Sequence, residues 1–340
     1  TQIESGDFYV YYTNDSSGEP TQPRLAIRMD GDNRIGEVRG ILPHQGVEPV
    51  MQEALDGKLS EFGGEADAYR KKSEDMRVLT ALEKKRENDE AFTKDDLVLL
   101  YEINGTIEGF GYQKDPRIVE LRQGRNSEED MLVIFECTRD EIAHVPSQIN
   151  ENTKAYVGQL EPGIFQKLPE NLEHVYTSFP EKKIRRENVE IGGKSAEQLI
   201  SEMEAAGINI SDYAKSMLKN REFVPGKNPE EATLIRLTVA DLGFKSSATT
   251  DQIYERAQIL GLELCPADTG PNYRLKYRNQ PLDEWIYMGM KQIAGSGGDP
   301  LVFSLVRVGD GLWLHGSWAG PDGGWYPNIE FVFRLRKSES

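Results

Sequence analysis

The sequence LVFSLVRVGDGLWLHGSWAGPDGGWYPNIEFVFRL, residues 301–335, contains the pattern that decides the fold. Residues 301–308, 312–314 and 329–335 are rich in β-branched, aromatic and other apolar side chains, which favour strands. Gly and Asp residues lie between these segments and permit the turns that antiparallel neighbours require. We therefore predict an antiparallel β-meander over residues 301–335.

The residues before this meander are expected to complete a compact α+β module with it. Thr249, Thr250 and Asp251 form a typical helix start, and Gly261 is a typical helix end. The stretch REFVPGKNPEE, residues 221–231, holds two prolines and a glycine and is the expected linker in front of the module. The expected elements of the module are a helix over 252–260, strands over 262–265 and 273–277, and an amphipathic helix over 282–291.

The first 41 residues predict β-structure. Residues 8–12 are aromatic and β-branched, which gives them strand preference. Segments 25–29 and 35–38 flank the sequence DGDN, residues 30–33, whose members accept the positive φ angles of a tight turn. A β-hairpin is therefore expected there.

The residues after the hairpin predict helices. Residues 48–134 are rich in Glu, Lys, Ala and Leu, and the longest uninterrupted helix is expected over 65–88. Residues 145–194 have an irregular pattern, and Ser195 and Ser211 then begin a predicted pair of helices. The expected fold class is α+β, with an N-terminal β-hairpin and helical domain at 1–144, a strand and turn region with the helical pair at 145–220, a linker at 221–231, and a C-terminal α+β module at 232–340.

Charge and composition narrow the classes of partner. The chain has 340 residues, with 40 Lys and Arg against 57 Asp and Glu, so its formal charge is −17. Nucleic acid is an unlikely partner for such a chain because phosphate binding requires clustered basic residues. No stretch approaches the roughly 20 apolar residues that span a bilayer, so no membrane partner is expected. Two distant cysteines and no leader pattern favour a reducing cytoplasm.

The residues that could carry catalysis form no recognisable motif. Cys137 and His144 are seven apart, but Cys137 follows an apolar run and precedes two acids, so a buried core thiol is expected. The two Cys and four His show no zinc-ligand spacing, and the glycine-rich segment at 295–300 lacks the Lys of a phosphate loop. We therefore expect no metal and no cofactor, and the sequence assigns no catalytic residue.

A cluster of aromatic residues in the C-terminal module is the most informative local feature. Trp313, Trp318 and Trp325 lie within thirteen residues, with His315 and Tyr326 beside them and several glycines between. Aromatic side chains on glycine-rich loops can form flat surfaces that stack on ligands. They can equally cover the core of a small domain. Both interpretations stay open, and these five residues are the predicted binding site.

Five segments carry a resemblance: RLAIRMDGDNRIGEVRG (24–40), NLEHVYTSFP (171–180), ATTDQIY (248–254), GLELCPA (261–267) and MGMKQI (288–293). They resemble segments of a family of hypothetical proteins from candidate-phylum bacterial genomes. In that family the C-terminal module recurs behind differing N-terminal parts. The resemblance thus implies a module boundary near residue 232, and it implies no activity.

The sequence favours a binding function. We expect a non-catalytic cytoplasmic interaction protein whose C-terminal aromatic face binds a protein or a small polar ligand. One alternative is a hydrolase or transferase that brings dispersed carboxylates together by folding. Another is an acidic inhibitor of a nucleic-acid-binding protein.

Overall fold

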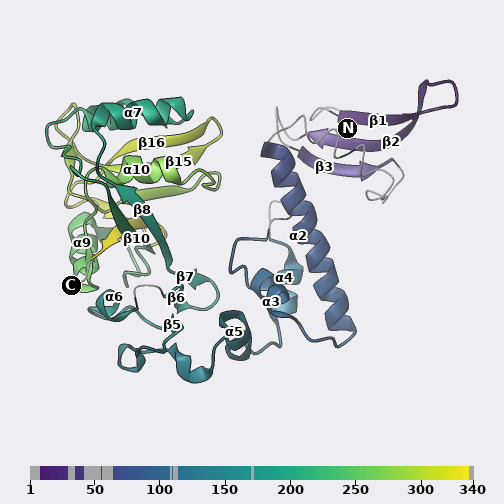
Figure 1. Ribbon diagram of the computed structural model, residues 1–340, viewed down its shortest axis with the longest axis horizontal. Helices are drawn as coiled ribbons and strands as arrows, with labels where there is room; N and C mark the ends of the chain where they lie inside the picture. The colour runs from purple at the N-terminus through teal and green to yellow at the C-terminus, as the bar shows by residue number, and fades with distance from the viewer. Residues whose placement is uncertain are drawn as a thin grey trace. The chain divides into compact units, whose positions relative to one another are not determined.

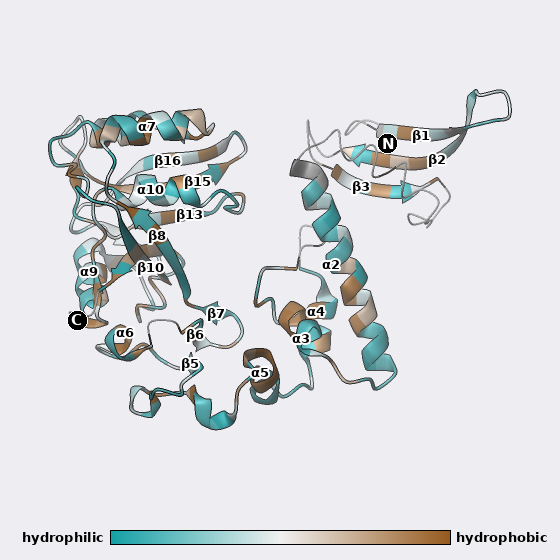
Figure 2. Cartoon of the chain, viewed as in Figure 1, coloured by the Kyte–Doolittle hydropathy of each residue, from teal (hydrophilic) through white to brown (hydrophobic). Residues whose placement is uncertain are grey.

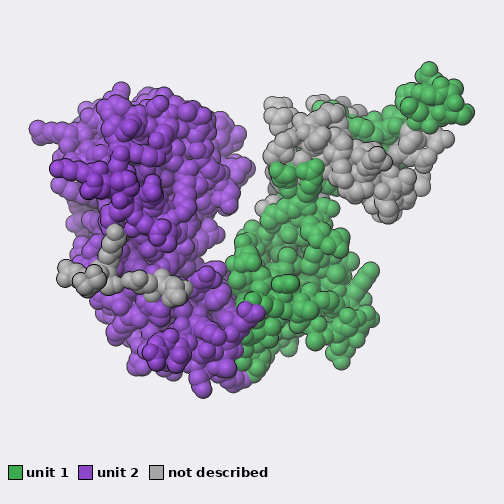
Figure 3. Space-filling model, viewed as in Figure 1, with its two compact units in different colours: residues 1–134 green, residues 135–340 purple. Residues whose placement is uncertain are grey.

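The computed structural model describes residues 8–29, 35–41, 55, 64–107, 109, 114–169 and 172–336 (Figure 1). The chain divides into two compact units, residues 1–134 and 135–340 (Figure 3). Helices and sheets both contribute substantially, which confirms the predicted α+β class. Within the described ranges, no helix combines the length and apolar character needed to cross a bilayer.

The first unit contains a three-stranded antiparallel sheet. Its strands run in the order β1, β2, β3, as the sequence predicts, while the turn residues 30–33 lie outside the described part of the chain. Leu25 and Ile27 of β2 are fully buried and pack with Leu55 and Tyr69. The strand bounds are β1 (Phe8–Asn14), β2 (Pro20–Met29) and β3 (Ile35–Gly40).

Helices form the remainder of the first unit, with ends set by local capping. Thr93 and Asp96 form a capping box at the start of α3, because each side chain accepts the other's backbone N–H. Asp115 caps α4, and Pro116 occupies the first helical turn. The long helix α2 is mainly hydrophilic with short hydrophobic patches (Figure 2), which is typical of a helix that buries one stripe. The bounds are α2 (Gly64–Glu87), α3 (Lys94–Leu100), α4 (Pro116–Arg122) and α5 (Ser127–Phe135).

A nine-stranded sheet organises the second unit. Its main path runs β8-β10-β18-β13-β15-β16-β9, with β12 paired to β18 and β14 paired to β15. Most pairs are antiparallel, but β13 pairs in parallel with β18 and β9 in parallel with β16. The bounds are β8 (Arg185–Ile191), β9 (Asn209–Ile210), β10 (Glu230–Thr238), β12 (Leu262–Glu263), β13 (Trp285–Met288), β14 (Ile293–Ala294), β15 (Pro300–Val308), β16 (Gly311–Trp318) and β18 (Glu330–Leu335).

Smaller elements surround this sheet. A four-stranded sheet contains β4 (Ile142–Ala143), β5 (Ala155–Val157), β6 (His174–Ser178) and β7 (Lys182–Lys183), while β11 (Ala248–Thr249) pairs with β17 (Gly324–Trp325). The helices are α6 (Ile164–Lys167), α7 (Ala196–Ala205), α8 (Asp212–Leu218), α9 (Thr250–Ile259) and α10 (Thr269–Lys276). The predicted caps Ser195, Ser211 and Thr249 begin α7, α8 and α9.

The two faces of the nine-stranded sheet are covered differently. Residues that pair across strands share a face, and successive residues in a strand alternate between faces. The helical face carries Phe303 and Leu314 and is packed by α8 and α10. Gly270 of α10 lies so close to it that an added Cβ would approach the Phe303 Cβ to 2.7 Å. The opposite face, the aromatic face, carries Phe331 and Phe333 and is packed by α9 through Tyr254.

Two element predictions are wrong. Residues 273–277, expected as a strand, lie mainly in α10, where Tyr273 stacks on Tyr277 one helical turn away. Residues 282–291, expected as an amphipathic helix, contain β13, in which exposed and half-buried residues alternate with buried Ile286 and Met288. The β13 strand also changes the expected meander, because it lies between β15 and β18. Tertiary pairing therefore overrides the local helical pattern.

The expected linker at 221–231 does not separate two cores. Phe223 is buried in the same hydrophobic cluster as residues before and after it, and Glu230 already pairs with Ile191 of β8. The buried Asp268 carboxylate accepts hydrogen bonds from the backbone N–H groups of Gly192 and Gly226, 2.8 and 3.2 Å away. Residues 145–220 and 232–340 thus share one sheet, and the division between compact units falls at 134/135.

Arg236 ties the centre of the sheet together from the helical face. Its side chain is 1% exposed, and its Nη2 atom lies 2.8 Å from Glu284 and 2.5 Å from Glu330. Burial alone would lower the pKa of Arg236, but the nearby Glu330 and Glu284 carboxylates raise it above its usual value. One guanidinium therefore joins β10, β18 and the residue preceding β13.

Replacing Arg236 by Met should destabilise the second unit by about 3 kcal/mol, because two partly buried carboxylates lose their counter-charge. Arg336→Met is the matched control, since Arg336 pairs with Glu263 through exposed side chains and should cost less than about 1 kcal/mol. Urea unfolding of both variants measures the difference. Equal losses in the two variants would show that the Arg236 network is not a central support.

Candidate functional site: an aromatic surface on the sheet

Strand register brings four ring-bearing residues onto one part of the aromatic face. Trp285 and Trp313 both pair with Val306 of β15, from β13 and β16 respectively. Tyr287 and His315 both pair with Ser304 in the same way. Rings from β13 and β16 thus flank the smaller side chains of β15. We call Trp285, Tyr287, Trp313 and His315 the aromatic platform.

The rings of the platform contact one another along β13 and β16, and one contact crosses β15. Ring centroids lie 5.9 Å apart for Trp285 and His315, 6.0 Å for Trp313 and His315, and 6.3 Å for Trp285 and Tyr287. The Trp285–His315 contact crosses the central strand, and Ser304 and Val306 of that strand are only 0% and 2% exposed. The four rings are thus linked by a chain of contacts from Tyr287 through Trp285 and His315 to Trp313.

The platform itself faces solvent. The Trp285 residue is 40% exposed, and Tyr287, Trp313 and His315 are each partly exposed. The helices that pack closely on β15 and β16 are α8 and α10, and both lie on the helical face. The aromatic face is therefore covered at its β18 end by α9 and left accessible at its β16 end.

Polar contacts fix the platform in place. The Trp313 indole N–H donates to the Asp310 carboxylate at 2.8 Å. The hydroxyls of Ser304 and Ser317 hydrogen-bond to each other at 2.8 Å and so satisfy the buried polar group under the rings. Burial raises the pKa of Tyr287, so its phenol stays neutral at physiological pH. A preorganised surface of this kind loses little conformational entropy when it binds.

The five site residues predicted from the sequence lie in different places in the structure, and only two of them belong to the platform. Trp313 and His315 belong to the platform. Trp325 is a core residue, 9% exposed, whose indole N–H donates to Thr250 Oγ1 at 2.8 Å. Trp318 is 53% exposed, but the strand alternation places its side chain on the helical face of the sheet. Its ring packs over the backbone at 320–323. Tyr326 is 69% exposed on the loop after β17.

Sequence reasoning missed Trp285 and Tyr287. They lie in the segment expected to be helical, and a helix there would not place them on the same sheet as Trp313. The signal was present in the sequence Trp285-Ile286-Tyr287-Met288, where aromatic and aliphatic residues alternate with the two-residue period of a strand. All four tryptophans of the chain lie between residues 285 and 325.

The possible catalytic groups are engaged elsewhere. Cys137, expected in the core, is half-buried, and burial together with the Glu141 charge raises the pKa of its thiol. The His144 ring bonds to the Val157 carbonyl at 2.9 Å instead of to Cys137. Glu284 and Glu330 both accept hydrogen bonds from the Arg236 guanidinium, and Glu284 also lies 3.7 Å from the Arg185 guanidinium, so both carboxylates are engaged in ion pairs. No cluster of three or more His, Cys, Asp and Glu side chains suited to a metal occurs in the described part of the chain.

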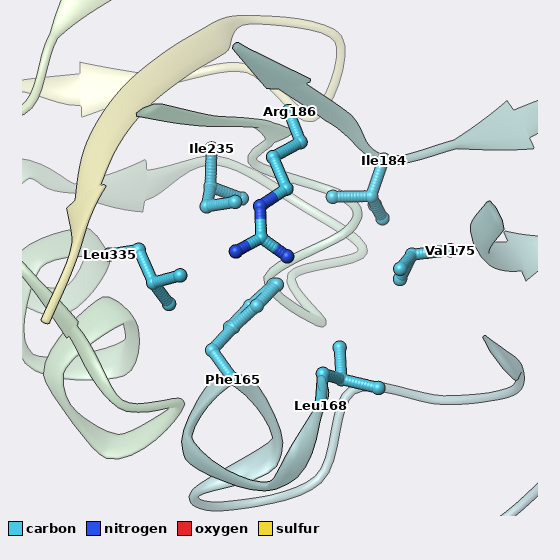
Figure 4. Close-up of a pocket in the computed structure, with 7 residues that line it drawn as sticks. All are labelled: Phe165, Leu168, Val175, Ile184, Arg186, Ile235 and Leu335. Atoms are coloured by element: carbon cyan, nitrogen blue, oxygen red, sulfur yellow. The ribbon is translucent and has the colours of Figure 1, made fainter. Parts of the chain in front are cut away.

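A small pocket beside β8 and β10 is too tight for a ligand. Figure 4 shows the Arg186 guanidinium extending into it among apolar side chains. The remaining space holds no more than about one water molecule. Its lining residues are Phe165, Leu168, Val175, Ile184, Arg186, Ile235 and Leu335.

Comparisons with known proteins assign no function to the platform, so its function is interpreted from its own residues. No family model, no curated protein and no solved structure matches the chain.

The two cysteines should differ sharply in reactivity. Cys265 is 4% exposed, and burial raises its pKa to about 12, whereas Cys137 is accessible. A thiol reagent such as DTNB at pH 8 should label one thiol in the folded protein and two after denaturation. Cys137→Ser should abolish the labelling of the folded protein, and Cys265→Ser should leave it unchanged. Labelling of Cys265 at the rate of Cys137 would contradict the described core.

Proposed function

We propose that the chain is a non-catalytic binding protein of the cytoplasm and that the aromatic platform is its binding surface. The observation that carries the proposal is the uneven covering of a single row of rings. Phe331 and Phe333 are fully buried beneath neighbouring elements, whereas Trp285 at the other end is 40% exposed.

Leaving these rings in water is costly. Apolar surface is stabilised by burial at about 25 cal/mol per Å², so exposed aromatic groups gain free energy when a partner covers them. Contiguous exposed apolar patches on folded proteins commonly mark interaction sites. Trp and Tyr also contribute strongly to binding energy at protein interfaces. The platform combines these properties on a rigid sheet. The free thiols of Cys137 and Cys265 agree with a reducing compartment.

The proposal is tested by capture of partners from native lysate with three forms of the full chain. The Trp285→Ala/Trp313→Ala double variant should lose the captured partner, because each ring should contribute about 2 kcal/mol if it lies at the centre of the interface. Trp318→Ala is the matched control, since Trp318 is the more exposed indole but lies outside the platform, and it should keep the partner.

Thermal unfolding and circular dichroism of the same samples establish that the variants are folded. A folded double variant that captures the same partners as the natural sequence would exclude the platform as the binding surface.

A further inference from the structure

We infer that the aromatic platform binds a basic segment of a partner protein through the guanidinium groups of its arginine side chains. This inference rests on the proposed binding function and adds the chemistry of the partner. Two observations carry it: acidic residues lie near the rings, and the two hydroxyl groups beneath the rings already hydrogen-bond to each other.

The strands that build the platform present no Lys or Arg side chain on its face, and His315 is their one basic residue there. Arg307 is the sole Lys or Arg in β13, β15 and β16. It alternates with Val306 and so lies on the helical face, where its Nη1 atom donates to the Gln280 carbonyl at 2.6 Å. A cationic ligand would therefore meet no Lys or Arg charge from these three strands on the aromatic face.

Two exposed acids lie at the end of the platform that holds both tryptophans. Asp310 is in the turn that joins β15 to β16, and its carboxylate oxygen touches the Trp313 indole N–H. Asp283 precedes Trp285 by two residues, and its backbone N–H donates to the Arg307 carbonyl at 2.8 Å. The Asp310 carboxylate thus contacts the Trp313 indole, and the backbone of Asp283 lies at the same end of β15.

Aromatic faces and carboxylates together favour a guanidinium. The faces of Trp and Tyr rings attract cations, and Trp does so most strongly. A guanidinium is planar and weakly hydrated, so it can stack on a ring and donate paired hydrogen bonds to a carboxylate. The formal charge of −17 would also accelerate encounter with a basic partner.

Other ligand classes fit the same surface less well. A sugar requires directed hydrogen-bonding side chains next to the ring on which it stacks. Here the Ser304 and Ser317 hydroxyls bond to each other, and one Asp310 oxygen is occupied by Trp313. Nucleic acid phosphates would be repelled by Asp283 and Asp310. A basic protein segment is the class that gains from both the rings and the acids.

The test titrates the full chain with a short peptide containing four arginines, in about 0.15 M salt, and follows binding by isothermal titration calorimetry. The comparison ligand is the same peptide with citrulline at the four positions, which keeps the planar shape and removes the charge. The arginine peptide should bind, and the citrulline peptide should bind at least about tenfold more weakly. Trp285→Ala/Trp313→Ala should weaken arginine-peptide binding by at least about tenfold, and Trp318→Ala should not.

A pair of charge variants separates local from general electrostatic attraction. Asp310→Asn and Asp322→Asn remove the same charge from exposed positions, but Asp322 lies in the loop that packs against the start of α9. Asp310→Asn should weaken binding several-fold more than Asp322→Asn. The comparison stays informative if the double tryptophan variant does not fold.

Equal effects of the two Asn variants, or equal binding of the two peptides, would overturn the inference. Its failure is distinguishable from failure of the proposed function. If the platform variant loses its lysate partner but the arginine peptide does not bind, the platform is a binding surface for another chemistry. If neither depends on the platform, both proposals are wrong.

Discussion

The buried guanidinium of Arg236 is the constraint on which the second unit depends. It binds Glu284 and Glu330, which belong to segments far from it in the sequence. Glu284 directly precedes β13, so this ion pair fixes the entry of the strand that is inserted in parallel beside β18. The Trp285 ring can meet the His315 ring of β16 only because β13 holds that position, so the support on the helical face determines what the aromatic face presents.

The two faces of the sheet have different roles. The helical face is closed by α8 and α10 and contains the charged network, so it contributes mainly to the specificity and stability of the fold. The aromatic face continues from a covered core at Phe333 to an accessible surface at Trp285. The same alternation of aromatic residues along the strands thus supplies both core packing and an accessible aromatic surface.

Local signals in the sequence predicted many elements. The caps at Ser195, Ser211 and Thr249 begin helices as expected, because capping depends on residues close in the chain. The strand order and β13 could not be read in this way, since they follow from pairing between distant segments. Of the five site residues predicted from the sequence, Trp313 and His315 lie on the platform and Trp325 lies in the core, whereas Trp285 was not among the five.

The accessibility of the four indole groups tests the central claim most directly. Each Nε1–H gives one NMR resonance, which single Trp→Phe variants assign, and a soluble paramagnetic agent reports its contact with solvent. The account predicts strong broadening for Trp285 and Trp318, intermediate broadening for Trp313, and protection for Trp325. Protection of Trp285 and Trp313 equal to that of Trp325 would contradict an accessible aromatic platform.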